Sequence, residues 1–201
     1  HVTGIPMSSR FFEHFDKSKV YEMFTLNPDK KVILFFGGGE FGLGKERTTE
    51  ILKAFIEKLP DYQIVAAAGK NEKMKESFEE LVNNCHTQDR VHVLGFTDKI
   101  PELMSICSLV VSKPGGLTTT ETLASELPMI IINPIPGQEE ENAEFLERKG
   151  AGVWIHSKDN PEEILVSLFQ DTNKLEDMRK SAKLLAKKNS TKEICNILFQ
   201  N

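Results

Sequence analysis

The sequence is poor in cysteine and has no long apolar run. Its three cysteines, Cys85, Cys107 and Cys195, lie far apart and lack the spacing of metal ligands, so we expect reduced thiols in a cytoplasmic protein. No apolar run approaches the roughly 20 residues of a membrane-spanning helix, and no signal peptide is recognisable. These absences argue against a disulfide scaffold, a cysteine-rich zinc site and an integral membrane protein.

Positively charged residues are fewer than negatively charged ones. Lys and Arg number 25 against 30 Asp and Glu, which gives a formal net charge of −5. A broad basic surface for nucleic acid is therefore not expected, and an anionic ligand must be held locally. The 39% of hydrophobic residues in 201 is enough for the core of one large domain.

Short β-branched runs alternate with amphipathic segments from Lys31 onward, which is typical of βαβ units and a parallel sheet. The predicted strands are 31–36, 63–68, 91–95, 109–112, 129–133 and 152–155. The predicted helices are 45–59, 72–84, 100–106, 117–126 and 139–149, and then 161–170, 175–187 and 191–199 at the C-terminal end. This pattern predicts an α/β, Rossmann-like, doubly wound six-stranded parallel sheet with C-terminal helices.

The first 30 residues contain no strand signal beyond the short apolar stretch 2–6. We interpret 1–30 as a linker and entry segment that leads into a single nucleotide-sugar-binding domain at 31–201. Within residues 1–30, one or two helices are expected to bury aromatic side chains, namely Phe11, Phe12, Phe15, Tyr21 and Phe24. The chain begins at His1 without an initiator Met, so we expect it to be part of a longer protein.

Ligands of open parallel sheets bind beyond the carboxyl ends of the strands. The loop at 37–44, GGGEFGLG, has five glycines in eight positions and suits close approach of a phosphate or sugar. Its spacing also matches a dinucleotide fingerprint, with Asp61 as the ribose acid, but Asp61 follows Pro60 in a turn. A loop without a ligand is the other alternative. The loop after the third strand places Phe96 and Thr97 where they could flank a base, or where Asp98 simply caps a helix.

The strongest signal is the run SKPGGLTTTE at 112–121. Gly115 and Gly116 open a turn, and Thr118 lies in the first helical turn, where free amides and the helix dipole attract a diphosphate. Glu121 follows three residues later and can accept two hydrogen bonds from a ribose, although it could also just complement the helix end. The packing face of this helix is predicted to be Leu117, Thr120, Ala124 and Leu127.

The loop and helix start at 134–142, PIPGQEEEN, follow the next strand. Amide and carboxylate side chains pair well with sugar hydroxyls, so Gln138, Glu139 and Asn142 are the sugar candidates. Glu140 and Glu141 are expected on a solvated helix face.

The runs SKPGGLTTTE and INPIPGQEEENAEF together resemble the donor-binding half of family 28 glycosyltransferases, in particular the monogalactosyl- and glucosyl-diacylglycerol synthases. The resemblance implies one half of a GT-B fold that binds a UDP-sugar without a metal or other cofactor. By motif, the backbone at Phe96 and Thr97 would hold uracil and Glu121 the ribose. The remaining donor residues implied by the motifs are Gly38, Gly39, Lys113, Gly115, Gly116, Thr118, Gln138 and Glu139.

In that family an amino-terminal domain binds the acceptor and supplies the presumed base, and this chain lacks its motifs. The resemblance implies inverting transfer of galactose or glucose to a diacylglycerol-type lipid by the full-length protein, peripheral on the cytoplasmic face of a membrane. The fragment alone is expected to bind donor without turnover. Three alternatives stay open: an N-acetylglucosaminyltransferase acting on a polyprenyl-linked acceptor, a naturally separate subunit, and a stand-alone nucleotide-binding module or NAD-dependent oxidoreductase.

Overall fold

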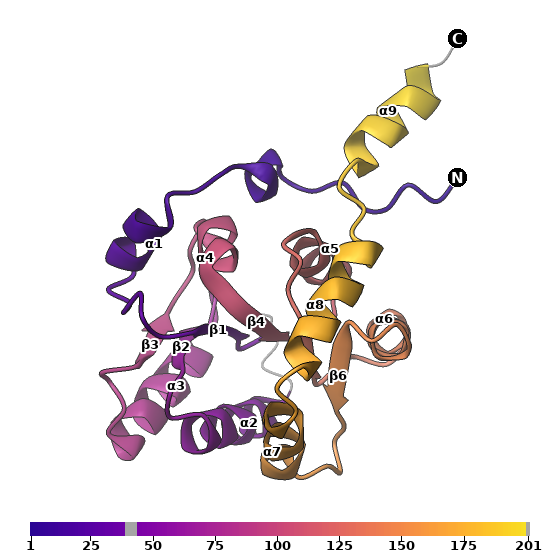
Figure 1. Ribbon diagram of the computed structural model, residues 1–201. Helices are drawn as coiled ribbons and strands as arrows, with labels where there is room; N and C mark the ends of the chain where they lie inside the picture. Colours follow the sequence, from indigo (N-terminus) through magenta and orange to yellow (C-terminus); the bar gives the residue numbers. More distant parts are fainter. Residues whose placement is uncertain (39–43, 200–201) are drawn as a thin grey trace.

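A single parallel sheet organises the molecule, as the computed structural model shows for residues 1–38 and 44–199 (Figure 1). Its six strands run in the order β3-β2-β1-β4-β5-β6. The strands are β1 (Val32–Phe36), β2 (Gln63–Ala67), β3 (Val91–Leu94), β4 (Cys107–Ser112), β5 (Met129–Ile132) and β6 (Gly152–Ile155). Every neighbouring pair is parallel, so the predicted fold class is confirmed.

Helices cover both faces of this sheet (Figure 1). They are α1 (Lys17–Met23), α2 (Lys45–Lys58), α3 (Glu72–Cys85), α4 (Ile100–Ile106), α5 (Gly116–Ala124), α6 (Gln138–Arg148), α7 (Pro161–Gln170), α8 (Lys174–Leu185) and α9 (Ser190–Phe199), with a 3-10 turn η1 at Ser9–Phe12. One face packs on α2, α3 and α7, and the other on α1, α4, α5 and α6. The sheet is therefore buried on both sides, which is why its strands read as continuous apolar runs.

Alternate residues of the central strand β1 enter different cores. Ile33 and Phe35 face α2 and α3, where Phe35 meets Phe55 and Phe78 edge to face with ring centroids 5.8 and 5.9 Å apart. Val32 and Leu34 face α1 and α4. This two-sided burial fixes the strand ends and the loops that follow them.

Most predicted boundaries lie within one residue of the structure; helix α8 ends two residues early, at Leu185, and two further shifts of two residues have a visible cause. Strand β4 begins at Cys107, because Cys107 pairs with Val32 directly after α4 ends. Helix α5 ends at Ala124, two residues early, because the chain turns through Glu126 at a φ of +56°. Neither shift moves a residue of the predicted site.

Part of the segment formed by the first 30 residues packs on the folded domain. Val20 of α1 and Leu26 are buried in the core on the α4 side. Upstream, Arg10 donates to the Asp98 carbonyl at 2.8 Å and pairs with the buried Glu102 carboxylate of α4. The segment thus straps across α4, and its second half belongs to the packed fold.

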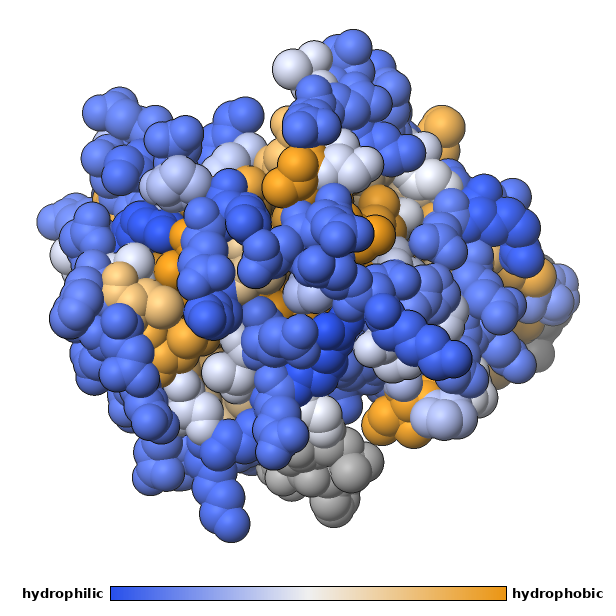
Figure 2. Space-filling model, turned by 90° about the horizontal axis from the view of Figure 1, so that it is seen from below, coloured by the Kyte–Doolittle hydropathy of each residue, from blue (hydrophilic) through white to orange (hydrophobic). Residues whose placement is uncertain are grey.

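Helix α9 projects away from the body, beside the start of the chain (Figure 1). Most of its residues are exposed. None of the helices in the part of the chain that the structure describes is long and apolar enough to cross a bilayer. The face seen in Figure 2 is mostly hydrophilic, with small separate apolar areas.

Candidate functional site

A cavity lies where the strand order reverses, between the carboxyl ends of β1 and β4. This switch point is where open α/β sheets bind their ligands. The cavity measures about 290 Å³. It is lined by Phe36, Gly38, Ala67, Gly69, Ser112, Lys113, Gly115, Thr118 and Glu139. Five of the twelve predicted donor residues thus meet in one cavity: Gly38, Lys113, Gly115, Thr118 and Glu139.

The first turn of α5 opens on this cavity. Gly115 is the N-cap, and no side chain caps the helix. The first helical bond runs from the Thr119 amide to the Gly115 carbonyl at 2.8 Å, so the amides of residues 116–118 have no acceptor within the helix. These amides and the positive end of the helix dipole suit a phosphate.

The three consecutive threonines serve different purposes. Thr118 lines the cavity, whereas Thr119 is buried and Thr120 donates its hydroxyl to the Gly116 carbonyl at 2.8 Å. The predicted packing face was partly wrong: Leu117 is 59% exposed, while Thr119 and Thr122 are buried. The helix is rotated so that small hydroxyl residues, not Leu117, fit closely against the sheet.

Lys113 and Gly38 meet at the cavity. A Cβ added to Gly38 would lie 3.3 Å from Lys113 Cε, and Gly38 has a φ of +94° that only glycine adopts readily. The lysine therefore reaches over the backbone of the first glycine loop, where its charge can meet a phosphate. Gly39 lies outside the described residues.

Glu121 is half-buried one turn below Thr118 and does not line the cavity. Burial raises the pKa of its carboxyl. Within residues 1–38 and 44–199 no donor pairs with this carboxylate. A ribose diol would supply two donors to it, so its assignment to the ribose stays a prediction.

The loop after β3 approaches the cavity through Gly69. A Cβ on Gly95 would lie 3.8 Å from the Gly69 carbonyl, and Gly69 lines the cavity. Phe96 is 69% exposed beside Lys70, whose Nζ lies 5.4 Å from the ring centroid. Thr97 Oγ1 accepts the Lys99 amide at 3.1 Å, so the predicted base loop is ordered but lies beside the cavity, not in it.

The start of α6 borders the same cavity from the other side. Glu139 Oε2 accepts the Ile135 amide at 2.7 Å, and Asn142 Nδ2 donates to the Pro114 carbonyl at 2.9 Å. Asn142 thus braces the loop that precedes α5. Gln138 is exposed, and its Nε2 lies 3.8 Å from the position that a Cβ on Gly116 would occupy. The assignment of Gln138 and Glu139 to the donor sugar stays a prediction.

Sequence reasoning did not name Phe36, Ala67 and Gly69 as lining residues, and it included Ser112 only as the first residue of the glycine run. Gly69 follows β2 with a φ of +62°, and the rule that ligands bind after strands would have found it. Ser112 is the last residue of β4 and is buried. Its polar type at the end of an apolar strand was the available signal.

Potential metal ligands and thiols are dispersed in the described ranges. There, no three His, Cys, Asp or Glu side chains lie close enough together to hold a metal ion. The three cysteines are free, and burial raises the pKa of the Cys107 thiol, which keeps it protonated and unreactive.

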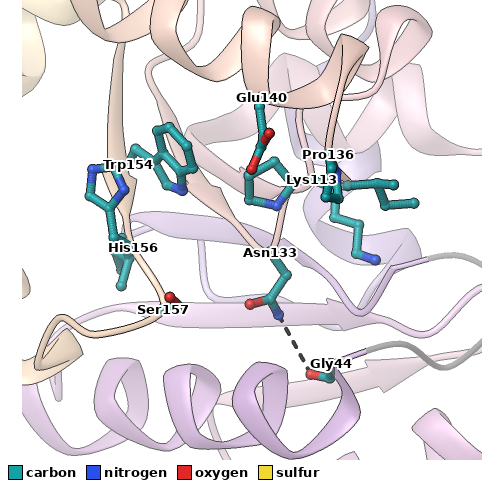
Figure 3. A pocket seen from close by; sticks show the side chains of 11 residues that line it. Gly44, Lys113, Asn133, Pro136, Glu140, Trp154, His156 and Ser157 are labelled. Carbon is teal, nitrogen blue, oxygen red and sulfur yellow. Dashed lines mark hydrogen bonds between the residues drawn. The ribbon is translucent and has the colours of Figure 1, made fainter.

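A second cavity of about 530 Å³ lies next to the first, at the carboxyl ends of β5 and β6 (Figure 3). The two share Lys113. Its wall includes the half-buried Glu140, whereas Glu141 is exposed as expected.

The parallel sheet, with its cavity at the switch point and an uncapped helix start, has the architecture of one Rossmann-like half of a GT-B fold. The sequence pattern of the glycosyltransferase family 28 C-terminal domain matches residues 32–197, and the chain belongs to this family. The predicted family is thereby confirmed.

Curated relatives carry a more specific name. The processive diacylglycerol beta-glucosyltransferase of Bacillus licheniformis is 36% identical over 199 residues, which cover 99% of this chain and 51% of the relative. The protein of the same name from Bacillus subtilis is 35% identical over 193 residues, covering 96% and 49%. The chain spans about half the length of the curated relatives it matches.

Solved structures agree on the fold. Anabaena Alr3699/HepE in complex with UDP and glucose superposes with a TM-score of 0.70 at 16% identity, covering 97% of this chain and 55% of that one. Acinetobacter baumannii MurG gives 0.67 at 19% identity, covering 98% and 58%. At such identities the likeness concerns the fold alone.

Proposed function

We propose that this chain is the donor-binding half of an inverting glycosyltransferase that moves a hexose from a UDP-sugar to a diacylglycerol-type lipid. The observation that carries the proposal is the cavity at the switch point, where the uncapped start of α5 meets Gly38, Lys113 and Thr118. Such a site suits a diphosphate in a chain with a net charge of −5, because the positive groups are concentrated locally.

The relatives' name supports the lipid and the glucose. Transfer requires stabilisation of the departing UDP, and here the helix start and Lys113 supply it without a metal. We place the catalytic base and the lipid site in an amino-terminal half that joins this one in the full-length protein. That protein acts at the cytoplasmic face of a membrane, as a peripheral enzyme.

Thermal unfolding of the 201-residue chain tests the donor site. UDP binds the native state preferentially, so at 100 times its dissociation constant it should add about 2.7 kcal/mol of stability, and NAD should add none. Stabilisation by NAD and not by UDP would refute the proposal. Measurable hexose transfer by this chain alone would refute the assignment of the base to another domain.

A further inference from the structure

Among the described residues that line the second cavity, Lys113 alone belongs to the donor assignment. The cavity is lined by Gly44, Lys113, Asn133, Pro134, Ile135, Pro136, Glu140, Trp154, Ile155, His156 and Ser157. Its volume, about 530 Å³, falls within the roughly 300–1,000 Å³ of small-molecule sites. It is therefore large enough for a sugar ring with part of its aglycone.

One wall of this cavity is apolar and flat. The Trp154 ring stacks against His156 with centroids 4.0 Å apart and planes tilted by 32°. Pro134 and Pro136 add rigid apolar surface nearby. The C–H face of a pyranose packs on such a wall, since an aromatic ring offers large contact area at low entropy cost.

Polar groups converge on the same space. Glu140 points from α6 toward Trp154 and Asn133 (Figure 3). Asn133 Nδ2 donates to Thr48 Oγ1 at 2.9 Å, which fixes the amide. In the described part of the chain, the Glu140 carboxylate, the Trp154 indole N–H and the His156 ring pair with no other side chain by a hydrogen bond. Donors and acceptors without protein partners beside an apolar wall are what hydroxyl groups require.

The layout along the sheet edge places this cavity next to the donor site. The base loop follows β3, Gly69 follows β2, the diphosphate cavity lies at β1 and β4, and the second cavity lies at β5 and β6. A donor that starts at β3 reaches its diphosphate at α5 and its hexose at Gln138 and Glu139. The second cavity borders that hexose position, because residues 134–136 and Glu140, on either side of Gln138 and Glu139 in the chain, line it.

We propose that this second cavity binds a neutral pyranose, the hexose of an already glycosylated lipid acceptor. The inference rests on the proposed function, because it takes the first cavity as the diphosphate site. One carboxylate and one lysine of opposite charge line it, so a neutral ligand fits better than an anion.

Trp154 reports on the cavity directly, because it is the only tryptophan of the chain. With UDP saturating, methyl β-D-glucopyranoside titrated into the 201-residue chain should change Trp154 emission in a saturable way. Glu140→Ala should weaken this binding by roughly fivefold or more, as expected for one lost hydrogen bond to a charged group. Glu144→Ala, on the same helix but exposed and outside the cavity, is the matched control and should match the parent chain.

Separate outcomes overturn separate statements. If UDP binds by calorimetry and the glucoside causes no saturable change, or if Glu144→Ala weakens binding as much as Glu140→Ala, the pyranose site is wrong. If UDP-glucose blocks the glucoside and UDP does not, the cavity belongs to the donor hexose and the acceptor assignment is wrong. Loss of UDP binding with the glucoside response kept would refute the proposed function and leave the pyranose site standing.

Discussion

Gly38 tests the donor cavity at the scale of one residue. Gly38→Ala places a Cβ at a φ of +94° and 3.3 Å from Lys113 Cε. We expect a loss of about 1–2 kcal/mol in the free energy of unfolding from backbone strain. UDP affinity should fall by roughly tenfold, because the lysine must move away from the phosphate site. Urea unfolding and calorimetry measure the two effects.

Gly137→Ala is the matched control for this substitution. Gly137 has a similar φ of +99°, but no atom lies within 4 Å of the added Cβ. It should cost similar stability and leave UDP affinity nearly unchanged. Equal losses of affinity in both variants would mean that strain alone, and not Lys113, controls binding.

Glu121 is expected to lower the stability of the unliganded chain and to strengthen UDP binding. Because burial raises the pKa of the Glu121 carboxyl, the folded state holds its proton more tightly than the unfolded state. Its ionised form therefore costs stability at neutral pH, and this cost vanishes as the pH falls through the raised pKa. Glu121→Gln should make the unliganded chain more stable at pH 7 and little changed at pH 4. UDP should bind about 1–3 kcal/mol more weakly if the ribose contacts are real.

Unchanged UDP affinity in Glu121→Gln would return this residue to a merely electrostatic role at the helix start. A stability gain that is the same at pH 4 and pH 7 would show that ionisation is not its source. Melting curves at the two pH values distinguish these outcomes.

The meeting of site residues was predictable where one loop contains them. Thr118, Gly115 and Lys113 follow from a single strand–turn–helix run, and the structure brings them together. The orientation of Leu117 was not predictable, because it depends on how α5 is rotated against the sheet. That rotation is set by neighbours distant in the sequence.

At the scale of elements, Arg10 joins the strap to α4 and the residues before it. The Glu102 side chain is 8% exposed, and Arg10 pairs with it while also donating to the Asp98 carbonyl at 2.8 Å. Arg10→Ala should lower the free energy of unfolding by about 2–3 kcal/mol, since a buried carboxylate loses its main partner. Chemical unfolding measures this loss.

A double variant makes this prediction sharper. Adding Glu102→Gln to Arg10→Ala removes the buried charge, so part of the lost stability should return. Glu13→Ala, at an exposed position next to η1, should change stability by less than about 0.5 kcal/mol. No recovery in the double variant would mean that the strap is held by its apolar contacts.

The regular elements were predictable because their signals are local. All six strands begin or end within two residues of the predicted bounds. The strap was not predictable, because Arg10 and Glu102 lie 92 residues apart and neither carries a pattern of its own. Long-range polar pairs of this kind need the fold before they can be seen.

Across the whole molecule, apolar side chains are buried around the sheet but exposed at the tip of α9. Both faces of the sheet are covered, yet Leu198 and Phe199 at the tip of α9 are 69% and 79% exposed. Paired exposed apolar residues on a projecting helix differ from the scattered ones found on most surfaces. The fold of this chain therefore should not depend on α9.

Deletion of residues 192–201 tests this independence. Because residues 192–199 are largely exposed, the deletion should lower the free energy of unfolding by less than about 1 kcal/mol and leave the denaturant slope unchanged. Deletion of 174–201 also removes the buried Met178 and Ala182 of α8, and should cost about 3 kcal/mol or more. A large loss from the shorter deletion would show that α9 packs on the body in solution. A small one means that its apolar face contributes nothing to this domain's own stability.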